Sequence, residues 1–291
     1  MELNNTHRGI LFMLLASLFF ALTMMFAKLL SDNMGSVEVT FWRNLIGLFF
    51  IAAISFNRPF KNVGGKPFTL VFRGVIGTIA LLAFFYTISQ STLSSSIVYS
   101  KTEPIFTAIL AFFLLKERLN RLSIFAIAIG FLGVVVISEF SFNYINIMGL
   151  MVGFMSALAY TSVRSLKAYY DERTVVLSFM IAGVILPALL MIVGSSIESP
   201  YLAFISDEFV MPSGIDWLWI ALMGVAAGYG QIFMTRAYFY AKAAIVSTIG
   251  YSVILFATIF GIILGDSLPN IWLLSGALMI IGSGVMLSRA K

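Results

Sequence analysis

Residues 9–30 read GILFMLLASLFFALTMMFAKLL, and Lys28 is the one charged residue in this run. A helix needs about 20 mostly apolar residues to cross the hydrocarbon core of a bilayer, so this run is long enough for one span. Similar runs recur along the chain, which is 60% hydrophobic and 11% charged and has a mean hydropathy of +1.00. Soluble domains carry roughly 25% charged residues. The composition therefore predicts an all-α, polytopic membrane protein and excludes a soluble one.

Ten such runs divide the 291 residues. Turn and charge signals separate them, as at Ser31-Asp32-Asn33 and Gly265-Asp266-Ser267. The expected spans are Gly9–Leu30, Glu38–Phe56, Phe68–Ser89, Ile97–Leu115, Leu122–Ser138, Ile147–Lys167, Val175–Gly194, Ile215–Arg236, Ala244–Leu264 and Ile271–Ser288.

The basic residues predict the orientation of these spans. With the N-terminus in the cytoplasm, 13 of the 18 Lys and Arg residues lie on the cytoplasmic side, and Lys28 is the one on the other side. An excess of Lys and Arg in loops marks the cytoplasmic face. We therefore expect both termini in the cytoplasm, and the net charge of +5 reflects topology and not nucleic-acid binding.

The residue types limit the chemistry. The chain has no Cys and one His, His7, which excludes disulfides, iron–sulfur clusters, thiolate zinc sites and a Ser-His-Asp triad. It has no Walker motif, so this chain does not hydrolyse ATP. We expect no catalytic residues, no metal and no cofactor.

An internal repeat divides the chain into residues 1–145 and 146–291, with five spans in each half. Because five is odd, the second half enters the membrane from the opposite side, as in transporters whose inverted repeats enclose a site near the midplane. Three motifs return in order: 9–11 (GIL) as 149–151 (GLM), 96–98 (SIV) as 244–246 (AIV), and 133–136 (GVVV) near 282–285 (GSGV).

Residues 103–119, EPIFTAILAFFLLKERL, resemble the fourth-helix signature of the EamA-type drug/metabolite transporters. Residues 41–44, FWRN, resemble the start of that family's second helix. The second half departs from the signature, since Ser252 stands in place of Pro104. The resemblance implies ten helices, of which one to four and six to nine surround a central cavity while five and ten lie at the periphery. It also implies an inner-membrane protein, often an exporter of amino acids or related metabolites.

Ionisable residues inside spans cost about 2.5–3.5 kcal/mol each on insertion scales, so each needs a reason. Arg43, Lys101 and Glu103 lie roughly 6–9 Å below the outer boundary, if each residue of a span rises about 1.5 Å. We expect an Arg43–Glu103 ion pair, which either fixes two helices statically or binds substrate as an external gate. Arg73 and Arg164 are close enough to the cytoplasmic ends to snorkel, or they line the inner mouth of the cavity and attract anions.

Pro104 predicts a bend beside these charges. It cannot donate a hydrogen bond to the Ser100 carbonyl, and it disfavours the α conformation at Glu103. A bent helix with Lys101 and Glu103 at the bend predicts a site in the outer half of the membrane, and the alternative is a simple kink.

Aromatic and amide side chains are candidates to complete the cavity. Tyrosine near a boundary is usually an interface anchor, so the deeper residues are the stronger candidates. The candidates are Trp42, Tyr86, Tyr99, Tyr160, Tyr229, Gln231 and Tyr251. The connection 195–214 is either a short interfacial helix or a plain loop.

The hypothesis is a secondary transporter of small organic metabolites that works by alternating access. Its partners are a small-molecule substrate and membrane lipid, no nucleic acid, and a second copy of the chain as a candidate for a homodimer. A channel and a non-transporting scaffold are the alternatives. An intramembrane enzyme is disfavoured, because no nucleophile–base pair or paired carboxylates stand within the spans.

The topology can be tested by cysteine labelling, because the chain has no background thiol. With a membrane-impermeant maleimide, Asn57→Cys, Asn120→Cys and Lys291→Cys should react from the cytoplasmic side alone. Asn33→Cys and Ser206→Cys should react from the outside. Labelling of positions 33 and 57 from one face would show that the span count or the orientation is wrong.

Overall fold

The structure is a computed structural model, and it describes residues 2–55, 60, 62–115, 120–139, 143–166, 168–193, 204–206, 209–241, 246 and 249–289. Within these ranges the chain forms helices and no strands. The helices are α1 (Glu2–Leu30), α2 (Ser36–Ser55), α3 (Pro67–Gln90), α4 (Leu93–Ser100), α5 (Glu103–Leu115), α6 (Arg121–Ile137), α7 (Tyr144–Leu166), α8 (Glu172–Val193), α9 (Asp216–Tyr240), α11 (Ser252–Ile263) and α12 (Ile271–Arg289).

Among the described helices, six are long and apolar enough to cross a membrane, namely α1, α2, α3, α7, α8 and α9. Three shorter apolar helices, α6, α11 and α12, accompany them. The predicted polytopic, all-helical class is therefore confirmed at this level.

Polar side chains form the N-caps of several helices, at the positions where the apolar runs begin. Thr92 accepts a hydrogen bond from the Ser95 N–H at 3.2 Å and caps α4, and Asn120 accepts from the Ser123 N–H at 2.8 Å and caps α6. Asn270 does the same for α12. Such caps satisfy backbone donors that the first helical turn leaves without partners.

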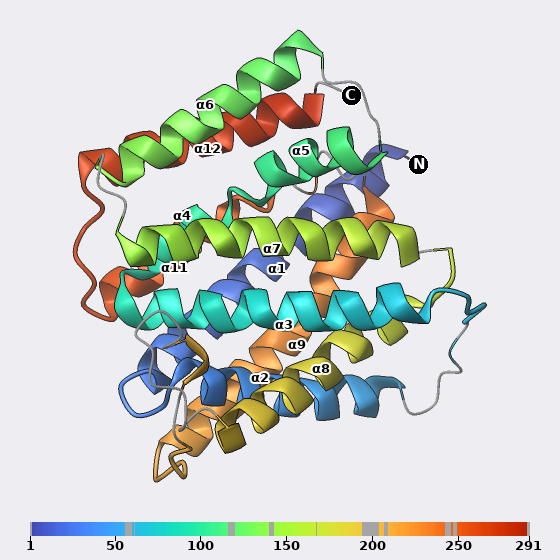
Figure 1. Ribbon diagram of the computed structural model, residues 1–291, viewed down its shortest axis with the longest axis vertical. Helices are drawn as coiled ribbons and strands as arrows, with labels where there is room; N and C mark the ends of the chain where they lie inside the picture. Colours follow the sequence, from blue (N-terminus) through green and yellow to red (C-terminus); the bar gives the residue numbers. More distant parts are fainter. Residues whose placement is uncertain are drawn as a thin grey trace.

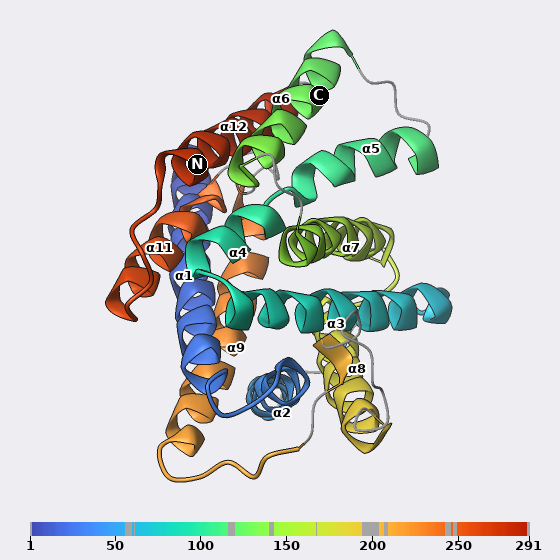
Figure 2. The same ribbon diagram turned by 60° about the vertical axis from the view of Figure 1, so that its left-hand side comes forward.

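The helices lie in a bundle in which segments distant in sequence run side by side (Figures 1 and 2). α1 packs along α9, α3 along α7, and α2 along α8. α6 and α12 form a pair at one edge of the bundle. In this pair Gly133 and Gly276 let the two backbones approach closely, since a Cβ on either would meet the carbonyl of the other at 2.6–2.9 Å.

One end of the bundle is held by Asp266, and we call it the Asp266 end. The Asp266 carboxylate forms an ion pair with Lys28 Nζ at 3.0 Å and accepts from the Leu93 N–H at 2.8 Å. Lys28 Nζ also donates to the Ser91 carbonyl at 2.6 Å. These bonds join the ends of α1, α3 and α11 to the start of α4.

The opposite end is organised around the α7–α8 connection, and we call it the Tyr169 end. The Tyr169 carbonyl accepts from the N–H groups of Val63 and Gly64, both at 2.9 Å. Lys66 Nζ lies 4.7 Å from the centre of the Tyr169 ring. Figure 1 shows the N- and C-terminal ends of the chain on this side of the bundle.

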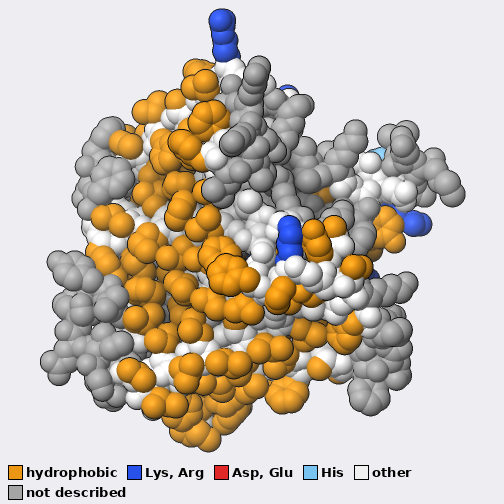
Figure 3. All heavy atoms as spheres, turned by 45° about the vertical axis from the view of Figure 1, so that its right-hand side comes forward, with side chains coloured by type: hydrophobic (Ala, Val, Ile, Leu, Met, Phe, Trp, Pro, Cys, Tyr) orange, Lys and Arg blue, Asp and Glu red, His pale blue; other side chains and the backbone are white. Residues whose placement is uncertain are grey.

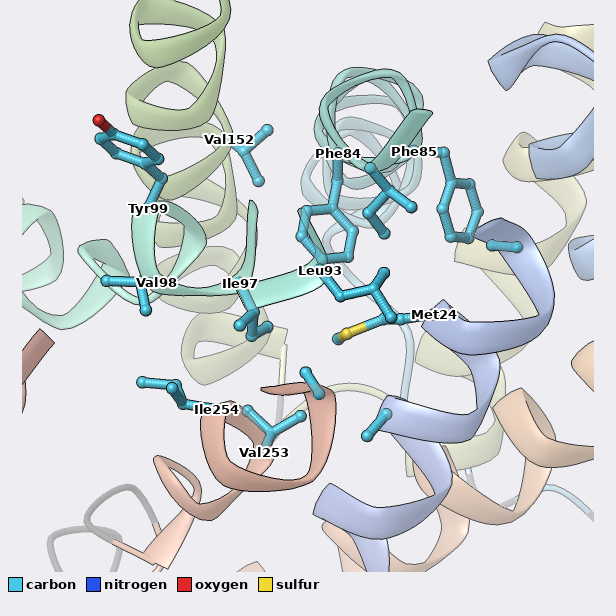
Figure 4. Close-up of a cluster of buried hydrophobic side chains, with 14 of the residues drawn as sticks. Met24, Phe84, Phe85, Leu93, Ile97, Val98, Tyr99, Val152, Val253 and Ile254 are labelled. Atoms are coloured by element: carbon cyan, nitrogen blue, oxygen red, sulfur yellow. The ribbon is translucent and has the colours of Figure 1, made fainter. Parts of the chain in front are cut away.

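The largest buried cluster joins α4 to its neighbours α1, α3, α7 and α11 (Figure 4). Leu93, Ile97 and Val98 of α4 are at most 2% exposed and contribute to its centre. Outside, hydrophobic side chains cover most of the described part of the face in Figure 3. An apolar exterior of this kind is what a lipid-facing surface requires.

The structure changes two predicted spans. The run predicted as one helix over Ile97–Leu115 begins at Leu93 and is broken into α4 and α5. In the predicted span Ala244–Leu264, α11 begins at Ser252, and Ala244 and Ile245 lie outside the described residues.

Of the predicted interfacial segment 195–214, Phe204 and Ile205 form a 3₁₀ turn and 209–213 have no regular structure. This connection lies over the start of α2, where Ser36 Oγ donates to the Phe204 carbonyl at 3.1 Å. Residues 195–203, the signature residues 116–119, and the labelling positions Asn57 and Lys291 lie outside the described residues.

The Asp266 network is testable by stability. Asp266→Ala removes the ion-pair partner of Lys28 and the acceptor of the Leu93 N–H, and the free energy of unfolding should fall by about 1.5–3 kcal/mol. The measurement is the melting temperature of the protein in lipid nanodiscs. Asp32, an exposed carboxylate near the same end, is the matched control, and Asp32→Ala should stay within about 0.5 kcal/mol of wild type. Equal effects of the two variants would contradict a structural role for Asp266.

Candidate functional site

The break between α4 and α5 is the central feature of the candidate site. Lys101 and Thr102 form a turn, and Thr102 Oγ1 donates to the Tyr99 carbonyl at 2.7 Å. α5 begins at Glu103, so Pro104 stands in the first turn of a new helix, where a missing N–H costs little. The predicted bend at Pro104 is therefore present, and it is a complete break.

Gly153 of α7 makes room for this break. A Cβ at residue 153 would coincide with Thr102 Oγ1 and would lie 3.3 Å from the Tyr99 carbonyl oxygen. The α7 backbone therefore packs directly against the turn. Glycine permits this close approach because it has no side chain.

The break is deeper than predicted. Because α4 begins at Leu93 and not at Ile97, Glu103 lies ten residues from the Asp266 end, which is about 15 Å at helical rise. The prediction was 6–9 Å, and the difference comes from the extra turn of α4.

Glu103 has four polar neighbours, one on its own helix and three on other parts of the chain. Its Oε1 accepts from Thr107 Oγ1 at 3.0 Å, one turn further along α5. Lys101 at the turn, Tyr160 of α7 and Tyr251 before α11 each lie within range of electrostatic interaction with Glu103. The structure thus brings four of the predicted residues into one region.

Arg43 faces a different helix from the one predicted. Its Nη1 donates to Asn44 Oδ1 at 2.8 Å, and its guanidinium carbon lies 5.5 Å from the centre of the Phe179 ring of α8. In the part of the chain that the structure describes, Arg43 forms no ion pair with Glu103. The expected Arg43–Glu103 pair is therefore wrong in this structure, because similar depth did not place the two residues on facing sides of their helices.

Arg73 also differs from the expectation that it snorkels toward the Tyr169 end. Its Nη1 occupies the place of a Cβ on Gly77, one turn further into the bundle, and its guanidinium carbon lies 4.8 Å from the Phe179 ring centre. Arg43 and Arg73 therefore share the Phe179 ring. Sequence reasoning missed Phe179, which is one of 28 phenylalanines and carries no distinguishing local signal.

The other predicted residues lie apart from this region. Trp42 Nε1 donates to Glu38 Oε1 at 3.1 Å, and its ring contacts Trp217 near the Asp266 end. Tyr86 contacts the Tyr144 ring near the same end. These two aromatic residues therefore lie toward the Asp266 end, apart from the α4–α5 break.

Tyr99 is buried in the large hydrophobic cluster and borders a pocket of about 160 Å³ at the Asp266 end. The Tyr229 ring packs against the Phe50 ring, with 5.0 Å between the ring centres. Gln231 is partly buried on α9, one turn from Ala227. The side chain of Arg164 lies outside the described part of the chain.

The chemistry of this region is ionic and hydrogen-bonding. Among the described residues, no group of three or more His, Asp or Glu side chains is placed to hold a metal ion. Arg43, Arg73 and Lys101 are cationic and Glu103 is acidic, and all four stand within apolar helices or at the break between two of them. This arrangement suits the binding of a charged small molecule.

A bundle of apolar helices with a few ionisable groups inside it is typical of a polytopic membrane protein. The model of the EamA-like transporter family matches residues 7–139, and a relative across the full length confirms the assignment. The chain belongs to the EamA-like transporter family, within the drug/metabolite transporters.

The chain is similar in sequence to three known relatives and similar in fold to one solved structure. An uncharacterized transporter of Helicobacter pylori is 34% identical over 96% of this chain and 94% of its own length. The pseudopaline exporter CntI of Pseudomonas aeruginosa is 26% identical over 100% of this chain and 99% of its own length. Solute carrier family 35 member G1 of Homo sapiens is 25% identical over 95% of this chain and 78% of its own length. A protein of known crystal structure aligns over 99% of this chain and 98% of its own, with a TM-score of 0.61 and 20% identity, and so shares the fold.

The close approach of α7 to the break is testable. Gly153→Ala places a methyl group where Thr102 Oγ1 lies, so the free energy of unfolding should fall by about 1–3 kcal/mol. Gly282, in α12, is the control, because a Cβ added there would have no other atom within 4 Å. Gly282→Ala should leave the protein unchanged or stabilise it by about 0.5–1 kcal/mol. Thermal melts in nanodiscs compare the two, and an unchanged Gly153→Ala protein would contradict the packing described.

Proposed function

We propose that the protein is a secondary transporter that exports small organic metabolites, such as amino acids or related compounds, by alternating access through a central cavity. The observation that carries the proposal is the broken helix α4–α5, with Lys101 and Glu103 beside the break. Within a bilayer, non-helical backbone is tolerated where it is buried in protein or lines a cavity. Broken helices with polar groups recur at the binding sites of transporters for this reason.

We also propose ten spans in two inverted repeats, residues 1–145 and 146–291. Helix contacts support this arrangement. Suppose that the helices of the two halves correspond in order: α1 to α7, α2 to α8, α3 to α9, α5 to α11 and α6 to α12. The repeat then exchanges α1 with α7 and α9 with α3, so the contact of α1 with α9 is equivalent to that of α7 with α3, and both contacts are present. Likewise α2 with α9 corresponds to α3 with α8, and α1 with α11 to α5 with α7.

The second half also carries an interruption where the first half has its break. Val246 and Ile249 are helical, Gly250 and Tyr251 form a turn, and α11 follows from Ser252. Tyr251 then stands where Glu103 stands in the first half. α4 packs against α11, so the two interruptions belong to neighbouring helices, and this supports a shared site at the centre.

The direction and location of transport are part of the proposal. The full-length similarity to the pseudopaline exporter CntI supports export. The concentration of Lys and Arg on one side supports an inner-membrane protein with both termini in the cytoplasm, so that the Tyr169 end faces the cytoplasm. A small-molecule substrate and lipid are the expected partners, and a homodimer is a further candidate assembly.

Flux in reconstituted vesicles separates a carrier from the alternatives. Purified protein in proteoliposomes is loaded with a panel of unlabelled amino acids, and uptake of each labelled amino acid is followed. Saturable uptake that is accelerated by the same solute on the other side supports a carrier. Flux that rises without saturation indicates a channel, and no flux of any tested solute favours a scaffold.

Glu103 is the acidic residue proposed to sense substrate or a proton. Glu103→Gln should fold and should lower flux to below about a tenth of the wild-type rate, because an ionisable group inside the membrane is costly and typically marks a functional site. Arg43→Gln should also lower flux, and the double variant should fold and stay inactive. Glu139→Gln, a carboxylate near the Asp266 end that accepts from Asn270, is the control and should keep its flux. Full flux in Glu103→Gln would contradict the proposed role.

A further inference from the structure

Two arginines in the bundle interior have donor atoms without partners. Arg43 is 4% exposed and Arg73 is 8% exposed. Nε of Arg43, and Nε and Nη1 of Arg73, are buried and make no hydrogen bond. Neither arginine forms an ion pair in the described ranges of the chain. A buried charge without a counter-charge is among the most expensive features a fold can carry.

The two guanidinium groups are held in one place by α8. Both lie over the Phe179 ring, with their central carbons 5.5 and 4.8 Å from the ring centre for Arg43 and Arg73. The two carbons are therefore within about 10 Å of each other, and the groups interact electrostatically. Tyr160 of α7 lies within electrostatic range of both. Two helices, α2 and α3, thus direct their guanidinium groups toward Phe179 of α8.

The surrounding residues hold the arginines in this position. Gly77 leaves the space that Arg73 Nη1 fills, and Asn44, whose Nδ2 donates to the Thr40 carbonyl at 2.8 Å, accepts from Arg43 Nη1. A ring and a neutral amide orient the two cations, but neither supplies a negative charge. An anion would complete this arrangement.

We propose that Arg43 and Arg73 together bind the anionic group, a carboxylate or a phosphate, of the transported molecule. This inference rests on the proposed transport function and names the substrate class, an organic anion. Guanidinium groups present planar arrays of N–H donors that match the oxygen atoms of carboxylate and phosphate. Because the donors are shielded in the present packing, the anion reaches them when the contact of α2 and α3 with α8 opens.

Glu103 fits this assignment because it lies in a separate group. It accepts from Thr107 and has Lys101 and Tyr251 within electrostatic range, so its charge does not neutralise either arginine by direct pairing. Tyr160 is the residue that interacts with Glu103 and with both arginines. A substrate whose anionic group binds at Phe179 therefore extends toward the α4–α5 break.

The test is anion binding by the full-length protein in nanodiscs, measured as a shift in melting temperature. The probes are the sodium salts of acetate, phenylacetate, succinate and phosphate, each titrated at constant ionic strength against chloride. Acetamide, phenylacetamide and succinamide are the neutral counterparts. Wild type should show a saturable rise with at least one anion and no rise with its amide.

Three variants locate the site. Arg43→Gln and Arg73→Gln should each weaken anion binding by about tenfold or more. Gly77→Ala keeps both charges and favours the helix, yet fills the space of Arg73 Nη1, so it should weaken binding in a protein that still folds. Arg236→Gln is the matched control, since Arg236 is exposed and its guanidinium carbon lies 5.9 Å from the Phe12 ring centre. It should keep wild-type binding.

Two results would overturn the proposal: no saturable shift with any of the four anions, or a shift that survives in all three interior variants. Flux measurements separate this proposal from the transport function. Anion binding without flux would leave the anion site standing and contradict transport. Saturable flux of a solute that lacks an anionic group, unchanged in Arg73→Gln, would support transport and contradict the anion site.

Discussion

The bilayer requires that every backbone N–H and C=O in its core find a partner within the protein, and the rest of this structure depends on that constraint. Continuous helices without an interior proline meet it through their own hydrogen bonds, which is why long apolar runs become α1, α3 and α9. The Lys101–Thr102 turn meets it in another way. Thr102 N–H and Oγ1 both donate to the Tyr99 carbonyl, and Gly153 brings α7 against the turn to exclude lipid. The polar groups of the candidate site lie where this exception occurs.

The positions of most helices follow from hydropathy, but the start of α4 does not. Residues 93–100 read LSSSIVYS, and the four serines lower the apolar signal of the run. In the fold, Ser96 Oγ donates to the Thr87 carbonyl at 2.9 Å and lies 2.8 Å from Ser91 Oγ. Serine hydroxyls can enter a membrane helix when they bond to nearby backbone. That information belongs to the neighbouring helix α3, so a scan of α4 alone could not contain it.

The residue types of the candidate site were predictable, whereas their partners were not. A proline beside Lys101 and Glu103 in an apolar run is a local signal, and the break is where that signal placed it. Which way Arg43 faces depends on the rotation of α2 about its axis, which α8 sets: Asn44 packs where a Cβ on Gly183 would lie, and Arg43 then meets Phe179. Depth along a helix can be counted from sequence, but rotation about the axis depends on tertiary packing.

The direction of Arg73 shows the same limit more sharply. Side chains on a helix lean toward its N-terminus, which for Arg73 is the Tyr169 end, and snorkelling favours the same direction. The guanidinium lies instead beside Gly77, toward the C-terminal end of α3. Two features outside the usual preference permit this: residue 77 has no Cβ, and Phe179 of α8 offers its ring at 4.8 Å. A cation–π contact stabilises an arginine by about 0.5–2 kcal/mol, which is less than an intramembrane charge costs. The ring therefore accounts for the direction of the side chain but not for the presence of its charge, and that imbalance is what an anionic ligand would remove.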